Sequence, residues 1–393
     1  MRFLIILVYS FIVPFCLYSQ TNPVYSKQGI PEYTNNFPVY PDMFYEYRIA
    51  ELNKKTPIEL VFNESVKHYI ELFSIQRHDE FAKIIGLTEL YFPIFDEYLD
   101  RYHLPFELKY LPVIESGLNP LAISKSGAVG LWQFLINTCK LFDLDVDSYI
   151  DERCDPYRST EAACKYLKYL NNIFNDWQLV LSSYNGGPGD VRKAIARSQG
   201  ETDYWKIRPF LSEQAQEYVP AFIAAVYLIN NYKEHNIVPV KPAFDYRNLD
   251  TLMLDYSLYF SQISDITGIS SEMLRFLNPV YKTDFIPDLD KPATLVLPSN
   301  KVIDFLSNES SILGKVNTKS DYFSMLKDAN NLNDKIKIIH VVEKGEFLHK
   351  IAMKYNCTPE NIKTWNNLPD FAINPGQKLI LWIDKEFYEQ MQK

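Results

Sequence analysis

The chain has 393 residues, of which 47% are apolar and 23% are charged, so it is long enough for two or three domains that each bury a core. Forty Lys and Arg residues stand against 49 Asp and Glu, and the formal net charge of −9 argues against a general nucleic-acid-binding protein. Only 13 residues are Gly whereas 28 are Tyr and 25 are Phe, which excludes collagen-like, low-complexity and disordered proteins.

Residues 1–19 are typical of a secretory signal peptide. Arg2 precedes an uncharged, largely apolar run, which ends at the small residue Ser19. Because this run is shorter than the roughly 20 apolar residues of a membrane-spanning helix, we expect export with cleavage rather than a membrane anchor. Lipidation at Cys16 stays open, although the preceding Phe15 is bulky where lipoprotein signals carry a small residue.

Residues 20–95 comprise a proline-rich leader followed by a helical region. In the helical part, apolar residues recur three and four positions apart, as on the buried face of a helix: Val66, Tyr69, Ile70, Phe73, Phe81, Ile84 and Ile85. Residues 96–236 form a second helical region, which holds six of the 13 glycines between positions 117 and 189. Because glycine is rare in this chain, its concentration here marks tight turns or close approach to a ligand.

The character of the sequence changes after a proline-containing linker at 238–242. Residues 254–298 and 338–383 resemble each other, since each predicts a strand, two helices and a closing strand, with the second helix reaching Asn278 or Asn366. We therefore expect an internal repeat of small α+β (βααβ) units. Residues 299–337 between them are predicted to be a solvated linker, because much of this stretch is rich in Ser, Asn, Lys and Asp.

The sequence gives no sign of a metal or a cofactor, and we expect neither. The six histidines are scattered, no segment has the pattern of a phosphate-binding loop, and the acidic residues 143–147 are not followed by the Gly and Glu of a calcium loop. Cys139, Cys154, Cys164 and Cys357 match no zinc spacing. Whether the first three include a disulfide stays open, since export permits one.

Glu115 is the candidate catalytic residue. It ends a largely apolar segment that begins at Leu104, and Gly117 and Pro120 terminate the predicted helix. A carboxylate at the C-terminal end of a helix dipole has a raised pKa, and burial among apolar side chains raises that pKa further. A carboxyl group that stays protonated near neutral pH can act as a general acid.

Three later segments place amide and phenol groups beside glycine or proline. They are 127–134 with Gln133, 182–187 with Tyr184 and Asn185, and 217–220 with Tyr218. Amides and phenols on tight turns suit a cleft that binds the acetamido and hydroxyl groups of a sugar.

Four motifs, in this order and spacing, resemble those of lytic murein transglycosylases with a goose-type-lysozyme-like catalytic domain: Glu115-Ser116, Gly130-Leu131-Trp132-Gln133, Tyr184-Asn185-Gly186-Gly187 and Tyr218-Val219-Pro220. The chain is most similar to the D-type branch, in which a helical region precedes this domain and LysM modules follow it. The resemblance implies a mainly α fold. A lysozyme-like catalytic domain would occupy 96–236, a degenerate LysM-like unit 254–298 and a LysM domain 338–383.

The resemblance also implies an activity, the cleavage of the β-1,4 bond between N-acetylmuramic acid and N-acetylglucosamine in peptidoglycan. Glu115 would protonate the bridging oxygen and then act as base on the muramic 6-hydroxyl, which closes a 1,6-anhydro ring. No second acidic residue in the four motifs fills the role of a nucleophile, which favours assistance by the substrate's own acetamido group. The implied substrate-binding residues are Ser116, Gln133, Tyr184, Asn185 and Tyr218, with Ser116 also orienting Glu115.

For the last unit, the resemblance implies binding of N-acetylglucosamine-containing glycans by loops around Gly345, Glu346 and Leu368. The expected partner is therefore the peptidoglycan glycan strand. We expect a monomer in the cell envelope, in the periplasm, with association to the outer membrane left open. Two alternatives also stay open: a hydrolytic lysozyme or chitinase of the same fold, and a non-catalytic LysM peptidoglycan-binding protein.

Overall fold

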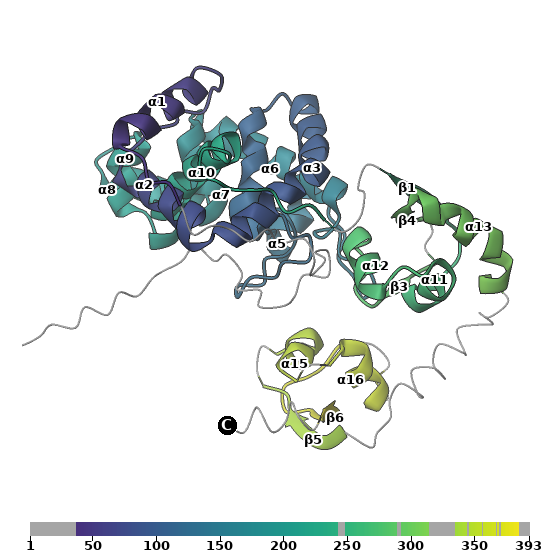
Figure 1. Cartoon of the computed structure of the whole chain (residues 1–393). Helices are drawn as coiled ribbons and strands as arrows, with labels where there is room; N and C mark the ends of the chain where they lie inside the picture. Colours follow the sequence, from purple (N-terminus) through teal and green to yellow (C-terminus); the bar gives the residue numbers. More distant parts are fainter. Residues whose placement is uncertain are drawn as a thin grey trace, which may run out of the picture. The chain divides into compact units, whose positions relative to one another are not determined.

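The structure is a computed structural model that describes residues 37–242, 248–288, 292–313, 335–343, 346–355, 357–366, 368 and 371–384. The expected signal peptide at 1–19, Cys16 and Gly345 lie outside these residues. The chain divides into two compact units between Glu309 and Ser310. The first unit holds a helical domain and a small α+β domain, and the second holds another small α+β domain (Figure 1).

The helical domain consists of α-helices joined by short 3-10 and π segments (Figure 1). In chain order these are α1 (Asp42–Asn53), α2 (Glu64–Glu71), η1 (Leu72–Gln76), α3 (His78–Arg101), η2 (Phe106–Tyr110), α4 (Leu111–Ser116), α5 (Ile136–Cys139), η3 (Lys140–Phe142), α6 (Pro156–Phe174), α7 (Trp177–Gly186), α8 (Pro188–Arg197), α9 (Tyr204–Ile207), η4 (Arg208–Phe210) and α10 (Glu213–Asn231). Helix α10 packs against α2, α4 and α7. Its residues from Tyr218 to Leu228 are all buried, because this stretch is apolar around the whole helix.

One hydrophobic core joins the two helical regions that the sequence suggested. It includes residues from Tyr45 of α1 to Val240, together with Phe276 and Leu277. It contains the apolar residues whose spacing predicted helices: Val66, Tyr69, Ile70, Phe73, Phe81, Ile84 and Ile85. The domain boundary expected at 95/96 falls inside α3, and Phe95 and Leu99 on either side of it are both buried in this core. The helical region before residue 96 is therefore part of the same domain as the site described below.

The first α+β domain follows the expected order of strand, two helices and strand. Its elements are β1 (Leu249–Leu254), β2 (Leu258–Tyr259), α11 (Phe260–Thr267), α12 (Ser271–Leu277), β3 (Phe285–Ile286), β4 (Ala293–Pro298) and α13 (Ser299–Leu313). Strands β1 and β4 pair antiparallel with Leu252 opposite Leu295, and β2 and β3 form a second, two-residue ladder. The mainly α fold with small α+β units is thereby confirmed for this part of the chain.

The structure differs from the linker expected at 299–337, because both ends of this stretch belong to regular structure. Residues 299–313 form helix α13, and residues 335–337 begin the next strand. Phe305 is completely buried, and it lies three positions after Val302, which is a helical spacing. The abundance of Ser and Asn concealed this short amphipathic pattern.

The second unit repeats the same order. Strand β5 (Lys335–Val341) pairs antiparallel with β6 (Lys378–Asp384), and α15 (Leu348–Lys354) and α16 (Pro359–Trp365) lie between them in the chain. The two helices and the inward-facing strand residues form a small separate core: Val342, Leu348, Ile351, Ala352, Ile362, Leu379, Leu381 and Ile383. The expected second βααβ unit is confirmed.

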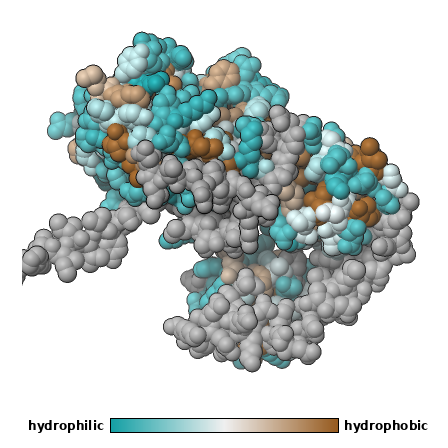
Figure 2. All heavy atoms as spheres, viewed as in Figure 1, coloured by the Kyte–Doolittle hydropathy of each residue, from teal (hydrophilic) through white to brown (hydrophobic). Residues whose placement is uncertain are grey.

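The surface and the helix lengths bear on the membrane question. Within the described part of the chain, no helix is both long enough and apolar enough to cross a bilayer. Figure 2 shows that hydrophilic residues cover much of the viewed face and that hydrophobic residues form small separate patches.

Candidate active site

Glu115 lies near the end of the short helix α4, as its sequence indicated. Pro112 stands in the first turn, where a missing N–H costs nothing, and Gly117 ends the helix in the left-handed conformation with φ of 60°. Val113 and Ile114 are buried, so the helix is fixed in the core and the partly buried Glu115 is directed toward a pocket.

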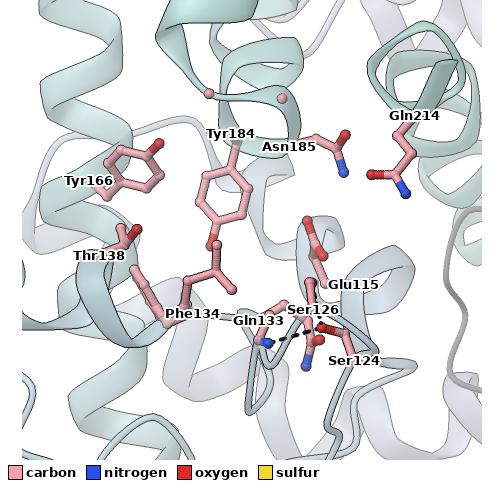
Figure 3. Close-up of a pocket in the computed structure, with 14 residues that line it drawn as sticks. Glu115, Ser124, Ser126, Gln133, Phe134, Thr138, Tyr166, Tyr184, Asn185 and Gln214 are labelled. Carbon is pink, nitrogen blue, oxygen red and sulfur yellow. Dashed lines mark hydrogen bonds between the residues drawn. The ribbon is translucent and has the colours of Figure 1, made fainter. Parts of the chain in front are cut away.

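The pocket has a volume of about 280 Å³ and is lined mainly by uncharged polar and aromatic groups. The lining residues are Glu115, Ser124, Ser126, Ala128, Gln133, Phe134, Leu135, Thr138, Tyr166, Tyr184, Asn185, Gly186, Gly187 and Gln214. Figure 3 shows the Glu115 side chain among these residues, with its carboxyl group directed toward Asn185. Three of the five residues expected to bind substrate around Glu115 thus meet in one pocket: Gln133, Tyr184 and Asn185.

Tyr218 is placed differently from the expectation. It is buried in α10, does not line the pocket, and donates its hydroxyl hydrogen to Oε1 of Glu115 at 2.5 Å. A buried phenol that donates to a carboxyl group holds that group in position. The contact of Tyr218 with a sugar stays a prediction.

Ser116, another residue expected to bind substrate, likewise lies outside the pocket lining. It is buried, and its Oγ lies 3.0 Å from the carbonyl oxygen of Pro112 and 2.9 Å from that of Leu131. The second contact ties the end of α4 to the turn that carries Gln133. Ser116 thus fixes the carboxyl-bearing helix against the pocket wall without facing the pocket itself.

The protonation of Glu115 follows from its surroundings. Desolvation by burial raises the pKa of the Glu115 carboxyl to about 7, although the hydrogen bond from Tyr218 acts to lower that pKa. Burial, which the sequence analysis also invoked, is the largest cause of this rise in pKa. The same burial, together with the charge of Glu115, raises the pKa values of Tyr184 and Tyr218 well above their ordinary range, so both phenols stay protonated.

Gln133 lies on a turn of residues 127–134, which we call the pocket turn. Its backbone has a φ of 50°, and Gly127 and Gly130 in the same turn have φ values of 81° and 88°, which glycine adopts without strain. The Gln133 side chain donates from Nε2 to the carbonyl oxygens of Gly130 at 2.8 Å and Ala122 at 3.2 Å. Its amide plane is thereby fixed at the pocket wall.

Tyr184 and Asn185 come from the last turn of α7. Asp176 caps the start of this helix by accepting from the Leu179 N–H, and the Tyr184 hydroxyl donates to the Trp132 carbonyl oxygen at 2.8 Å. Among the described residues, no protein group hydrogen-bonds to the buried Oδ1 of Asn185. An unsatisfied buried acceptor in a pocket indicates a place for the N–H group of a ligand.

The sequence analysis missed several residues that complete the pocket. Tyr166 on α6 packs against Tyr184 with ring centroids 5.4 Å apart, and Phe134 and Thr138 lie near it at the same end of the pocket (Figure 3). Gln214 comes from the first turn of α10. Phe134 belongs to the pocket turn, whereas Thr138, Tyr166 and Gln214 lie on α5, α6 and α10. Nothing local distinguishes these three from ordinary helical residues, because tertiary packing brings them to the pocket.

The residues expected to bind glycan in the second unit have mixed outcomes. The Glu346 carboxylate is buried, lies 2.7 Å from Nε2 of His340 and accepts the Glu343 N–H at 2.8 Å. These contacts make its role internal to the fold. Leu368 is partly buried against the core of the unit, and Gly345 lies outside the described residues.

No metal or disulfide site is found among the described residues. They hold no cluster of His, Cys, Asp and Glu side chains that could bind a metal ion. Cys139, Cys154 and Cys164 are buried free thiols, and burial raises the pKa of each. The three thiols are thus unpaired in this structure.

Comparison with known families places this pocket in a defined class of domain. Residues 93–207 match the transglycosylase SLT domain, 248–313 the LysM-like domain of the lytic transglycosylase MltD, and 340–382 the LysM domain. The chain thus contains an SLT transglycosylase domain followed by two LysM-type domains, which confirms the resemblance drawn from the four motifs.

Several of the similar proteins are named as lytic transglycosylases. The chain is 29% identical over 285 residues to membrane-bound lytic murein transglycosylase D of two Escherichia coli strains, K12 and O6:H1. The alignment covers 72% of this chain and 61% of each relative. A solved structure of the 70 kDa soluble lytic transglycosylase SLT70 from Escherichia coli is 24% identical, with a TM-score of 0.31, over 38% of this chain and 25% of that one.

Proposed function

We propose that this protein is an exported lytic murein transglycosylase that cleaves the MurNAc-β-1,4-GlcNAc bond of peptidoglycan and forms a 1,6-anhydro-muramic end. One observation carries the proposal: the Glu115 carboxyl has a pKa of about 7, is held by Tyr218 and faces a pocket lined with amide and phenol groups. Homology to lytic murein transglycosylase D supports the same activity.

In the first step, Glu115 acts as a general acid. Its raised pKa keeps a large fraction protonated at neutral pH. The proton moves to the oxygen between the sugars, the bond from that oxygen to C1 of the muramic residue breaks, and the N-acetylglucosamine leaves with a free hydroxyl group.

The muramic C1 then needs stabilisation, and the described lining of the pocket offers no second carboxylate for it. Among the described residues that line the pocket, Glu115 is the one acidic side chain. A glycosidase that forms a covalent glycosyl-enzyme intermediate requires two carboxyl groups about 5 Å apart. The acetamido group of the muramic residue itself is therefore proposed to stabilise C1.

In the second step, the Glu115 carboxylate acts as a base. It accepts the proton of the muramic 6-hydroxyl while O6 bonds to C1, so the anhydro ring closes, the carboxyl regains its proton and no water is consumed. The hydrogen bond from Tyr218 stabilises the carboxylate between the two steps, because a hydrogen bond to the charged form favours that form.

Three residues are proposed to hold the sugars. The unsatisfied Oδ1 of Asn185 suits the N–H of an acetamido group. Gln133 has both amide hydrogens directed to backbone oxygens, which leaves its carbonyl oxygen for a sugar hydroxyl. Tyr184 supplies an aromatic wall beside Tyr166.

The second unit is proposed to bind N-acetylglucosamine-containing glycan and to keep the pocket near its polymer. This proposal rests on the match of residues 340–382 to the LysM domain. A tethered binding module raises the effective concentration of substrate at the catalytic domain. We further propose that the protein acts as a monomer in the periplasm.

Digestion of purified peptidoglycan, followed by mass spectrometry of the products, tests this function. We expect 1,6-anhydro-muramic ends, which are lighter by one water than the reducing ends left by a hydrolytic lysozyme. Glu115→Gln should release neither, whereas the matched control Glu107→Gln, in η2 outside the pocket, should act like the wild type. Products with reducing ends only would contradict the transglycosylase assignment, and an active Glu115→Gln would contradict the role of this carboxyl.

A further inference from the structure

Arg153 contacts the pocket turn through both its backbone and its side chain. A Cβ atom placed on Gly130 would lie 1.8 Å from the Arg153 carbonyl oxygen, so the turn rests directly on that peptide group. Arg153 Nη1 also donates to the carbonyl oxygens of Gly127 at 3.3 Å and Phe134 at 3.2 Å. These two oxygens are the first and last of the pocket turn, so one guanidinium group joins its two ends.

Arg153 is itself fixed by a buried ion pair. Its Nε and Nη2 donate to the two carboxylate oxygens of Asp151 at 2.9 and 2.6 Å, and the exposed fractions of the two residues are 8% and 6%. A bidentate guanidinium–carboxylate contact fixes the orientation of the guanidinium group and also neutralises its charge. Lysine at position 153 would keep the charge and lose this geometry.

Asp151 and Arg153 belong to a segment, residues 147–153, that also forms hydrogen bonds to the first LysM-type domain. The Asp151 N–H donates to the Val280 carbonyl oxygen at 2.8 Å, and the Lys282 N–H donates to the Tyr149 carbonyl oxygen at 2.8 Å. Nζ of Lys282 adds a bond of 2.8 Å to the Asp147 carbonyl oxygen. Asp151 is thus joined to Val280 through its backbone and to Arg153 through its side chain.

We propose that Arg153 is a positioning residue for Gln133, and that the LysM-like domain supports the pocket through segment 147–153. The inference deepens the proposed function, since it concerns the same pocket. The Gln133 amide is held by the carbonyl oxygens of Gly130 and Ala122. Arg153 joins the two ends of the pocket turn, and its own position depends on Asp151 and the domain bonded to it. On this account the LysM-like domain is a structural part of the catalytic unit.

Hydrogen–deuterium exchange on the full chain tests the support without requiring activity. We expect Arg153→Lys to speed exchange of the amides at 129–134 by about fivefold or more, since local opening governs exchange. Arg101→Lys is the matched control, because Arg101 pairs with the exposed Glu97 on α3, away from the pocket turn and from segment 147–153. Lys282→Pro, which removes the backbone donor to Tyr149, should produce a smaller increase at the same amides.

A double-mutant cycle, measured by steady-state kinetics, tests whether Arg153 acts through Gln133. We expect Arg153→Lys to lower kcat about tenfold with a smaller change in KM, and to have little further effect in a Gln133→Ala background. Unchanged exchange in Arg153→Lys, or additive effects in the cycle, would overturn the positioning role. Unchanged exchange in Lys282→Pro would overturn the support from the LysM-like domain. A chain without activity on peptidoglycan would contradict the proposed function and leave the exchange result as the test of this inference.

Discussion

The two LysM-type domains share an internal bond pattern but differ in what surrounds them. In the first domain, Asn278 Nδ2 donates to the Leu274 and Val296 carbonyl oxygens, and its Oδ1 accepts the Val296 N–H at 2.7 Å. Asn366 in the second domain makes the same three bonds with Ile362 and Ile380. The match between these asparagines, each following the second helix, is strong support for the internal repeat.

The surroundings distinguish the two domains. The first shares a core with the helical domain, to which its Phe276 and Leu277 contribute, and it bonds to segment 147–153. The second has a small core of its own and forms a separate compact unit. One fold thus serves as a fixed part of a catalytic unit in one place and as an independent module in the other.

The substitution with the largest expected effect, Glu115→Gln, acts on the catalytic region and on neither LysM-type domain. Glu115→Gln keeps the shape of the side chain and removes its transferable proton, so turnover on peptidoglycan should fall by about a thousandfold or more. Binding to intact sacculi, measured by pelleting, should stay unchanged because the second unit is untouched. Retention of more than a few per cent of activity would show that another group supplies the proton.

Removal of all residues after Leu313 sharpens the comparison, because it deletes the independent domain and keeps the fixed one. Binding to sacculi should weaken by about tenfold or more through the loss of effective concentration. The rate on short soluble glycans should stay within about twofold of the intact chain. Equal pelleting of the two proteins would show that the second unit does not anchor the enzyme to the wall.

Substitution of either of the two equivalent asparagines should have a smaller and more local effect, on domain stability. Asn278→Ala and Asn366→Ala each remove three hydrogen bonds and leave buried backbone groups without partners, at a cost of about 2 kcal/mol in the stability of the surrounding domain. Asn278→Ala should lower the melting temperature of the catalytic unit, whereas Asn366→Ala should affect the second unit alone. Calorimetry that showed equal effects of both variants on the catalytic unit would contradict the difference between the domains.

Much of the fold and of the central site could be predicted because the signals are local. Glycine after a short apolar helix marks the end of α4 and the position of Glu115, and period-three-and-four spacing marks the core helices. Helix α13 was not predicted, because the polar run that begins at Ser307 obscured the apolar residues Val302, Phe305 and Leu306 before it.

The remaining features depend on tertiary contacts. Tyr166 enters the pocket through the packing of α6 against α7, and Tyr218 turns its hydroxyl toward Glu115 because α10 packs against α4. The sequence gives the residue types of Ser116 and Tyr218 but cannot say which way their hydroxyl groups point. For the same reason it could not assign Arg153, whose partners Gly127 and Phe134 lie 26 and 19 positions away.

The pH dependence of kcat/KM on purified peptidoglycan, at fixed ionic strength, tests most directly whether Glu115 is the acid. This quantity reports the pKa of the free enzyme, and the reaction requires the protonated carboxyl, so the rate should fall as pH rises through about 7. Well above that pH the fall should approach tenfold per pH unit, with circular dichroism showing that the protein stays folded. A rate that stayed level between about pH 6 and 9 in the folded protein would contradict Glu115 as a general acid with a raised pKa.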